Sequence, residues 1–173
     1  MSRVLIFNGS PRKANCFNIQ NKVVDICIKK NIDYKLFSIE DSEIKGCNHC
    51  INVCSINCAL KDPLYPILNN FDYSGILLIS PVYFFSLNAQ TKAFIDRTNA
   101  LNMNDIKFGS IITSSWGKEI GGRDIISNML KRYTNSKNMK FVGLYHKKTY
   151  DRIEPLSIGD NFWIEYLLSK ISC

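Results

Sequence analysis

The 173-residue chain lacks a long hydrophobic run. It contains no stretch of roughly eighteen apolar residues, so no membrane-spanning helix is expected. The N-terminus also lacks the layout of a secretory signal, because its apolar stretch is short and leads directly into a Gly-Ser-Pro turn. We therefore expect a cytoplasmic protein. The cytosol keeps thiols reduced, so clustered cysteines there favour metal binding or redox chemistry over disulfides. The chain has seven cysteines, and this odd number also argues against a closed disulfide framework.

Several nucleotide-binding and catalytic signatures are also missing. The sequence has no G-x-G-x-x-G, no G-x-x-x-x-G-K-S/T, and no Cys-x5-Arg at its first turn. These absences exclude a Rossmann fingerprint, a P-loop and a low-molecular-weight phosphatase. Only two histidines occur, and no Ser-His-Asp or paired-carboxylate constellation stands out. The net charge of +7 is spread along the chain without a basic arm or recognition helix, so we expect an anionic small ligand rather than nucleic acid.

Apolar runs and turn signals alternate along the chain in a strand–helix order. Strands are expected at residues 3–8, 33–39, 73–80, 107–114 and 140–145. Helices are expected at residues 15–31, 87–101, 121–133 and 162–171, with part of 61–71 also helical. This order is typical of a doubly wound α/β sheet. No linker or repeat divides the chain, so we predict a single domain over residues 1–173.

Three loops follow expected strands, at the edge of the sheet where doubly wound folds bind ligands. The first, Ser-Pro-Arg-Lys before a helix, offers backbone N–H groups and two cations to a phosphate. The second, SPVYFF, brings three consecutive aromatic residues, and the third, TSSWG, brings small residues and one Trp. A phosphate grip beside aromatic and backbone groups predicts a mononucleotide site, and a flavin fits it best.

The motifs NGSPRK, SPVYF and AQTKAFIDRT resemble, in this order, the flavodoxin-like NAD(P)H-dependent FMN reductases. A cysteine-rich stretch before Asp62 is similar to the iron–sulfur flavoprotein branch of that family. The resemblance implies a flavodoxin-like, five-stranded parallel sheet in the order 2-1-3-4-5, with the cysteine-rich insert, about residues 46–62, after the second strand. It also implies non-covalently bound FMN and a homodimer or tetramer with FMN near the subunit interface.

The same resemblance implies a set of FMN-binding positions. Around the phosphate it places Ser10, Arg12, Lys13, Asn15 and Cys16. Along the flavin ring it places Pro81, Val82, Tyr83, Phe84 and Phe85, and on the other side Thr113, Ser114, Ser115, Trp116 and Gly117. No protein group is expected to be catalytic, because flavin N5 is the reactive centre. From the residues themselves, Lys118 and Arg123 are expected either close to the ring edge or as solvated charges at a helix start. His146 is expected at a strand end, on the surface or at the edge of the core.

The stretch GCNHCINVCSINC contains the candidate metal ligands Cys47, Cys50, Cys54 and Cys58. Thiolates ligate iron–sulfur clusters, and a 4Fe–4S cluster agrees with the resemblance. The C-x2-C-x3-C-x3-C spacing also allows a helical stripe of buried or reactive thiols, and zinc is a third alternative. One continuous helix would spread the four sulfurs over roughly 16 Å, too far for one centre. The cluster therefore depends on whether residues 51–57 are helical; their Asn and Ser residues favour a loop.

Three functions are consistent with these features. The first is an FMN-dependent oxidoreductase of the iron–sulfur flavoprotein type, which takes electrons from NAD(P)H or a ferredoxin to an acceptor that the sequence does not identify. The second is a cluster-free NAD(P)H-dependent FMN or quinone reductase. The third is a non-catalytic, flavodoxin-like electron carrier.

Overall fold

The structure is a computed structural model that describes residues 3–50, 58–115, 121–150 and 152–172. Five parallel strands form its sheet in the order β2-β1-β3-β5-β6. Their bounds are β1 Arg3–Asn8, β2 Asp33–Ser38, β3 Gly75–Tyr83, β5 Lys107–Ser114 and β6 Lys140–Lys148. The predicted five-stranded order is confirmed, with one addition: the short β4, Ser86–Leu87, pairs antiparallel with the end of β3.

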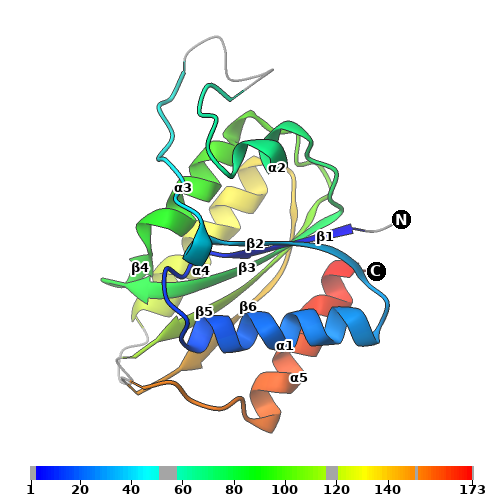
Figure 1. Ribbon diagram of the computed structural model, residues 1–173, viewed down its shortest axis with the longest axis vertical. Helices are drawn as coiled ribbons and strands as arrows, with labels where there is room; N and C mark the ends of the chain where they lie inside the picture. Colours follow the sequence, from blue (N-terminus) through cyan, green and yellow to red (C-terminus); the bar gives the residue numbers. More distant parts are fainter. Residues whose placement is uncertain (1–2, 51–57, 116–120, 151, 173) are drawn as a thin grey trace.

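Helices cover both faces of this sheet, as Figure 1 shows. One face carries α1 (Asn15–Lys29) and α5 (Ile158–Ser172). The other carries α2 (Tyr65–Asn69), α3 (Ala89–Arg97) and α4 (Gly121–Ser136). Two 3-10 turns, η1 (Ile39–Asp41) and η2 (Thr98–Ala100), follow β2 and α3.

Alternate residues of the central strands fill two separate cores. In β1, Leu5 and Phe7 belong to the core under α2, α3 and α4, whereas Val4 and Ile6 belong to the core under α1 and α5. A strand that is buried on both faces reads as an unbroken apolar run, which is why the strands were recognisable in the sequence. In the described part of the chain, no helix is long and apolar enough to cross a bilayer.

Several element bounds differ from the prediction. The helix predicted from residue 87 begins at Ala89, because Leu87 pairs in β4 and Asn88 caps the helix by accepting from Thr91 N. The last helix begins at Ile158 instead of residue 162. There, Ser157 N donates to Asp160 Oδ2 and Asp160 N donates to Ser157 Oγ, a reciprocal capping pair that starts the helix earlier.

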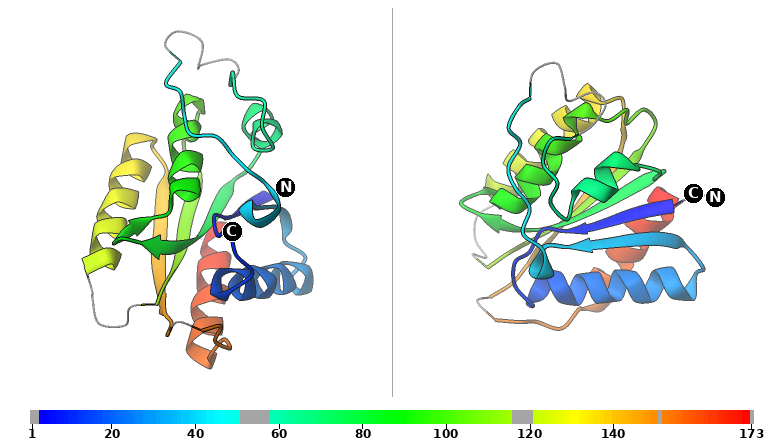
Figure 2. Two further views of the ribbon diagram at one scale, coloured as in Figure 1. Left: turned by 60° about the vertical axis from the view of Figure 1, so that its left-hand side comes forward. Right: turned by 45° about the horizontal axis from the view of Figure 1, so that its top comes forward.

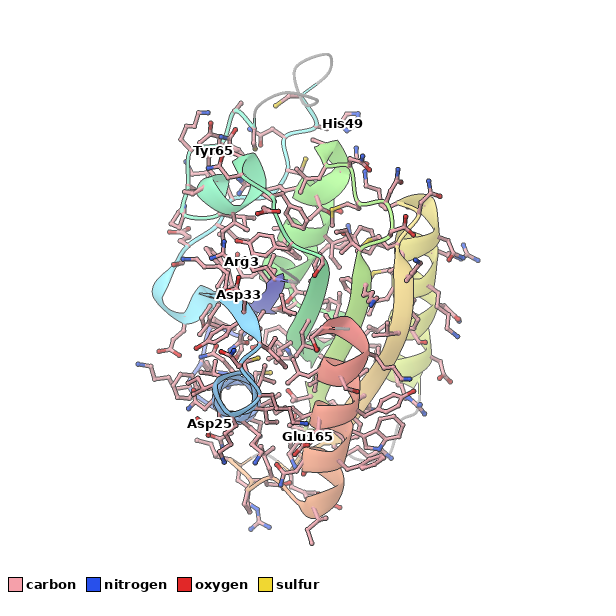
Figure 3. The ribbon with its side chains drawn as sticks, turned by 90° about the vertical axis from the view of Figure 1, so that its right-hand side faces the viewer. Arg3, Asp25, Asp33, His49, Tyr65 and Glu165 are labelled. Atoms are coloured by element: carbon pink, nitrogen blue, oxygen red, sulfur yellow. The ribbon has the colours of Figure 1, made fainter. Side chains whose placement is uncertain are left out.

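The cysteine-rich insert lies in the chain between η1 and α2. Both views in Figure 2 show the described chain on either side of residues 51–57 rising past the ends of α2 and α3. In Figure 3, His49 of the insert and Tyr65 of α2 lie at the opposite end of the molecule from Asp25 and Glu165 on α1 and α5. The question whether residues 51–57 are helical lies outside the described residues.

Candidate functional site

The loop between β1 and α1 closes on itself through short-range hydrogen bonds. Asn8 Oδ1 accepts from Ser10 N at 3.0 Å, and the Asn8 side chain is fixed in turn by donating to Gln20 Oε1 at 2.8 Å. The Ser10 hydroxyl donates to Arg12 O at 3.0 Å and accepts from Arg12 N at 3.3 Å. The loop that was predicted to grip a phosphate is therefore organised by its own side chains.

A buried polar network joins this loop to the end of β3 and the start of α3. Asn88 Nδ2 donates to Gly9 O at 2.6 Å, and Ser80 Oγ donates to Asn88 Oδ1 at 3.3 Å. Thr91 Oγ1 donates to Ser80 Oγ at 2.9 Å. All of these side chains are buried. Sequence reasoning missed this network, although Asn before a helix is a common N-cap signal that could have indicated Asn88.

The three consecutive aromatic residues form the turn between β3 and β4. Tyr83 pairs with Ser86, so Phe84 and Phe85 are the two central residues of a tight hairpin turn. Both have left-handed backbones, with φ of 47° and 61°, a combination that favours Asn-Gly in such turns. Phe84 is 98% exposed and Phe85 is 46% exposed. The turn thus holds two large apolar rings at the surface in a costly backbone conformation.

Two cavities that share lining residues lie at the carboxyl edge of the sheet, where β3 and β5 end, and one of them also borders the start of α1. We call them the polar cavity, about 280 Å³, and the apolar cavity, about 600 Å³. The polar cavity is lined by Ser10, Arg12, Ala14, Asn15, Cys16, Pro81, Val82, Tyr83, Thr113, Ser114, Ser115, Thr149, Arg152 and Ile153. The apolar cavity is lined by Val82, Tyr83, Phe84, Phe85, Ser114, Ser115, Gly122, Arg123 and His146. The two cavities share Val82, Tyr83, Ser114 and Ser115.

The structure therefore gathers most of the predicted FMN positions around these two cavities. Lys13 is the exception, since its Nζ lies 2.6 Å from Glu40 Oε1 and it does not line either cavity. The predicted positions Trp116 and Gly117 lie outside the described residues. Asn15 lines the polar cavity, but its amide is engaged: Nδ2 donates to Arg152 O at 2.9 Å and Oδ1 accepts from Glu154 N at 2.8 Å.

The segment after β6 contributes residues that sequence reasoning did not assign. Thr149, Arg152 and Ile153 line the polar cavity. Arg152 brings a second guanidinium to the wall that holds Arg12. The segment is held against α1 by the Asn15 amide, a contact across 137 residues that no local pattern could have indicated.

His146 also lines the apolar cavity, because β6 continues three residues beyond the predicted strand end. Its Nε2 lies 2.8 Å from Ser114 Oγ. Burial, and then the charges of Lys148 and Arg123, lower the pKa of His146, which favours the neutral ring. Arg123 lines the same cavity, whereas Lys118 lies outside the described residues. The apolar cavity therefore has one polar side.

Cys16 acts as a buried hydrogen-bonding group rather than a charge. It is 2% exposed, and its Sγ lies 3.2 Å from Thr113 Oγ1. Burial raises the pKa of the Cys16 thiol to about 11, outweighing the hydrogen bonds from Thr113 and Ser10. A protonated thiol at this place ties α1 to the end of β5 and adds no negative charge to the polar cavity.

The described cysteines of the insert are free thiols. Cys47 is exposed, whereas Cys50 and Cys58 are half-buried; Cys54 lies outside the described residues. Over the described ranges, no three Cys, His, Asp or Glu side chains already stand together in a geometry that could hold a metal. The donor chemistry fits an iron–sulfur cluster, because thiolates are its ligands.

The fold and the position of the cavities define a flavodoxin-like domain. Oxidised flavodoxin 1 from Bacillus cereus superposes with a TM-score of 0.65 at 13% identity, covering 99% of this chain and 100% of that one. The chain belongs to the NADPH-dependent FMN reductase family, whose sequence model matches residues 2–135.

Two curated relatives carry the name iron–sulfur flavoprotein. One from Archaeoglobus fulgidus is 25% identical over 169 residues, covering 93% of this chain and 83% of the relative. Another from Methanocaldococcus jannaschii is 30% identical over 105 residues, covering 58% of this chain and 54% of the relative. The sequence resemblance to the iron–sulfur flavoprotein branch is thus confirmed.

Proposed function

We propose that the chain binds FMN across the two cavities and works as an FMN-dependent oxidoreductase of the iron–sulfur flavoprotein type. One observation carries this proposal: a polar cavity lined by Arg12 and Arg152 shares Tyr83 and Ser114 with an aromatic-walled cavity. FMN has the same two parts, a phosphate on a polar chain and a flat ring system. Bound flavin supplies hydride and electron transfer, while the protein supplies position and electrostatics.

The start of α1 suits an anion at the phosphate end. The first turn of α1 contains no acidic residue, and the N-cap residue, Ala14, has no side-chain acceptor for the first N–H groups. These groups and the helix dipole favour a phosphate in the polar cavity, beside Arg12 and Arg152. In the apolar cavity, Tyr83, Phe84 and Phe85 would cover the ring, with Arg123 and His146 at its polar side.

For the insert we propose a 4Fe–4S cluster ligated by Cys47, Cys50, Cys54 and Cys58. The free thiols of the described cysteines and the names of the relatives support it. Electrons would enter from NAD(P)H or a ferredoxin and leave to an acceptor still to be identified. We also propose self-association as a homodimer or tetramer near the FMN site, and a cytoplasmic location in which the thiols stay reduced.

The phosphate end can be tested by comparing FMN with riboflavin, which lacks the phosphate. Flavin-free protein is titrated with each, following the quenching of flavin fluorescence. We expect Arg12→Gln to weaken FMN binding roughly tenfold or more and to leave riboflavin binding unchanged, because a charge-assisted phosphate contact is lost. Lys13→Gln is the matched control, since Lys13 is paired with Glu40, and its FMN affinity should stay within about threefold of wild type.

Equal affinities for FMN and riboflavin in the wild-type protein would contradict the phosphate site. The loaded protein is then mixed with NADPH or NADH. With an artificial electron acceptor present to reoxidise the flavin, oxidation of either nicotinamide under multiple turnover indicates a reductase, whereas flavin binding without turnover indicates the electron carrier.

A further inference from the structure

Arg97, the last residue of α3, is a buried cation at the base of the cysteine-rich insert. Its side chain is 1% exposed, and its ion-pair partner Asp62 is 6% exposed. A buried charge is costly unless it is paired and hydrogen-bonded, so the partners of Arg97 show what it holds.

The guanidinium of Arg97 connects the two ends of the insert. Nη1 donates to Asp62 Oδ2 and, at 3.4 Å, to Lys45 O, on the side where the chain enters the insert. Nη2 donates to Leu60 O at 3.3 Å, on the side where the chain returns. Asp62 closes the ring by accepting from Lys45 N at 2.8 Å and from Leu64 N at 3.2 Å. The insert therefore begins and ends on one ion pair.

The same guanidinium also reaches a candidate ligand. Arg97 Nη2 lies 3.6 Å from Cys58 Sγ, within hydrogen-bonding distance for sulfur. Hydrogen bonds to ligand sulfurs help to set the reduction potential of a cluster. Arg97 Nε is buried, with no hydrogen-bond partner among the residues that the structure describes. A purely structural clamp would require neither the sulfur contact nor this unsatisfied N–H.

We propose that Arg97 is a positioning residue for the iron–sulfur centre: it fixes both ends of the insert and directs an N–H at Cys58 Sγ, which raises the reduction potential of the centre. This inference rests on the cluster proposed above. Arg97 then has two separate roles, the ion pair with Asp62 and the contact with Cys58.

The test uses full-length protein purified without oxygen and reconstituted with iron and sulfide. Iron and acid-labile sulfide are assayed, and the midpoint potential of the cluster is measured by a redox titration followed by electron paramagnetic resonance. Lysine keeps the charge and can pair with Asp62, but its compact ammonium cannot form the same fork toward Cys58. We expect Arg97→Lys to keep its iron and to shift the redox equilibrium at least tenfold toward the oxidised cluster, about 59 mV for one electron.

Two further variants separate the roles. Asp62→Asn removes the carboxylate but leaves the guanidinium beside Cys58, so stability should fall while the redox equilibrium stays within about threefold of wild type. Lys147→Gln removes a second buried ion pair, Lys147–Asp160, whose side chains are 7% and 5% exposed. It should destabilise the protein comparably and leave iron content and potential unchanged.

Different failures have different meanings. If wild-type protein takes up no iron and sulfide, the proposed cluster and this inference both fail. If wild type holds a cluster and Arg97→Lys leaves its potential unchanged, only the role of Arg97 is overturned. A tenfold or larger shift in Asp62→Asn would mean that the ion pair alone matters, and this outcome overturns the role of the Cys58 contact even if Arg97→Lys does not fold.

Discussion

At the scale of single residues, Gly9 shows how closely the site loops approach one another. A Cβ at this position would lie 1.9 Å from Thr91 Oγ1 and 3.0 Å from Thr91 Cβ. Thr91 is fully buried and bonded to Ser80, so it cannot move aside cheaply. The absence of a side chain at Gly9 therefore allows the β1–α1 loop and α3 to share one polar network.

We expect Gly9→Ala to lower the free energy of unfolding by about 1–3 kcal/mol, because an added methyl group overpacks this contact. FMN affinity should fall roughly tenfold with it, since the displaced loop carries Ser10 and Arg12. Urea denaturation and flavin titration measure the two effects. Gly159→Ala is the control, because the nearest contact of its added Cβ would be an ordinary 3.7 Å to Ser157 Oγ. Wild-type stability and affinity in Gly9→Ala would refute the close-approach argument.

At the scale of elements, the β3–β4 hairpin lowers the stability of the fold at the wall of the apolar cavity. Two consecutive left-handed phenylalanines cost about 1–2 kcal/mol each relative to residues suited to that conformation. Burial of the two exposed rings within the described chain offsets little of this conformational cost, yet both rings line the apolar cavity. Strain maintained at a cavity wall is the pattern expected of a functional surface.

We expect the double variant Phe84→Asn/Phe85→Gly to raise the free energy of unfolding by about 1–2 kcal/mol, because Asn-Gly suits this turn. Flavin affinity should fall in the same variant, because the ring wall is lost. The control Phe84→Ala/Phe85→Ala removes the rings but keeps side chains at positive φ, so it should lose affinity without gaining stability. Denaturant unfolding measures the free energy of unfolding of both variants, and equal values would show that the turn stores no strain.

At the scale of the whole molecule, a buried ion pair anchors each side of the sheet. Arg97–Asp62 holds the insert against α3, and Lys147–Asp160 holds β6 against the start of α5. Burial by itself would raise the pKa of Asp160. Hydrogen bonds from Lys147, Tyr145 and Ser157 outweigh it and lower the pKa to about 2. The pKa of Asp62 is lowered in the same way by Arg97, against its burial.

These carboxylates make stability depend on acid in a definite direction. Asp160 has a folded pKa of about 2 against an ordinary value of 3.8, so the unfolded chain binds the proton first as the pH falls. Its contribution, about 2 kcal/mol, should be complete above about pH 5 and lost as the pH falls through 2. Unfolding free energies measured across this range should fall less steeply in Asp160→Asn than in wild type.

The matched control for this acid profile is Glu165→Gln. Glu165 pairs with Lys30 at 2.9 Å on the surface, where solvent screens the interaction, so the variant should follow the wild-type curve. An Asp160→Asn curve parallel to wild type between pH 5 and 2 would contradict the assignment of this acid sensitivity to the Lys147–Asp160 pair.

The sequence by itself determined the sheet and the edge at which the site lies. Strands buried on both faces must be apolar throughout, and the loops after them must lie together at one edge, so the positions near Ser10, Tyr83 and Ser114 were predictable from local patterns. Only the tertiary structure decided which side chains are available there. Lys13 is paired with Glu40, the Asn15 amide holds a segment 137 residues away, and Arg97 joins both ends of the insert. The physical reason is that folding determines which partners come within reach of these charged and amide groups. Local sequence patterns carry no information about contacts between residues far apart in the chain.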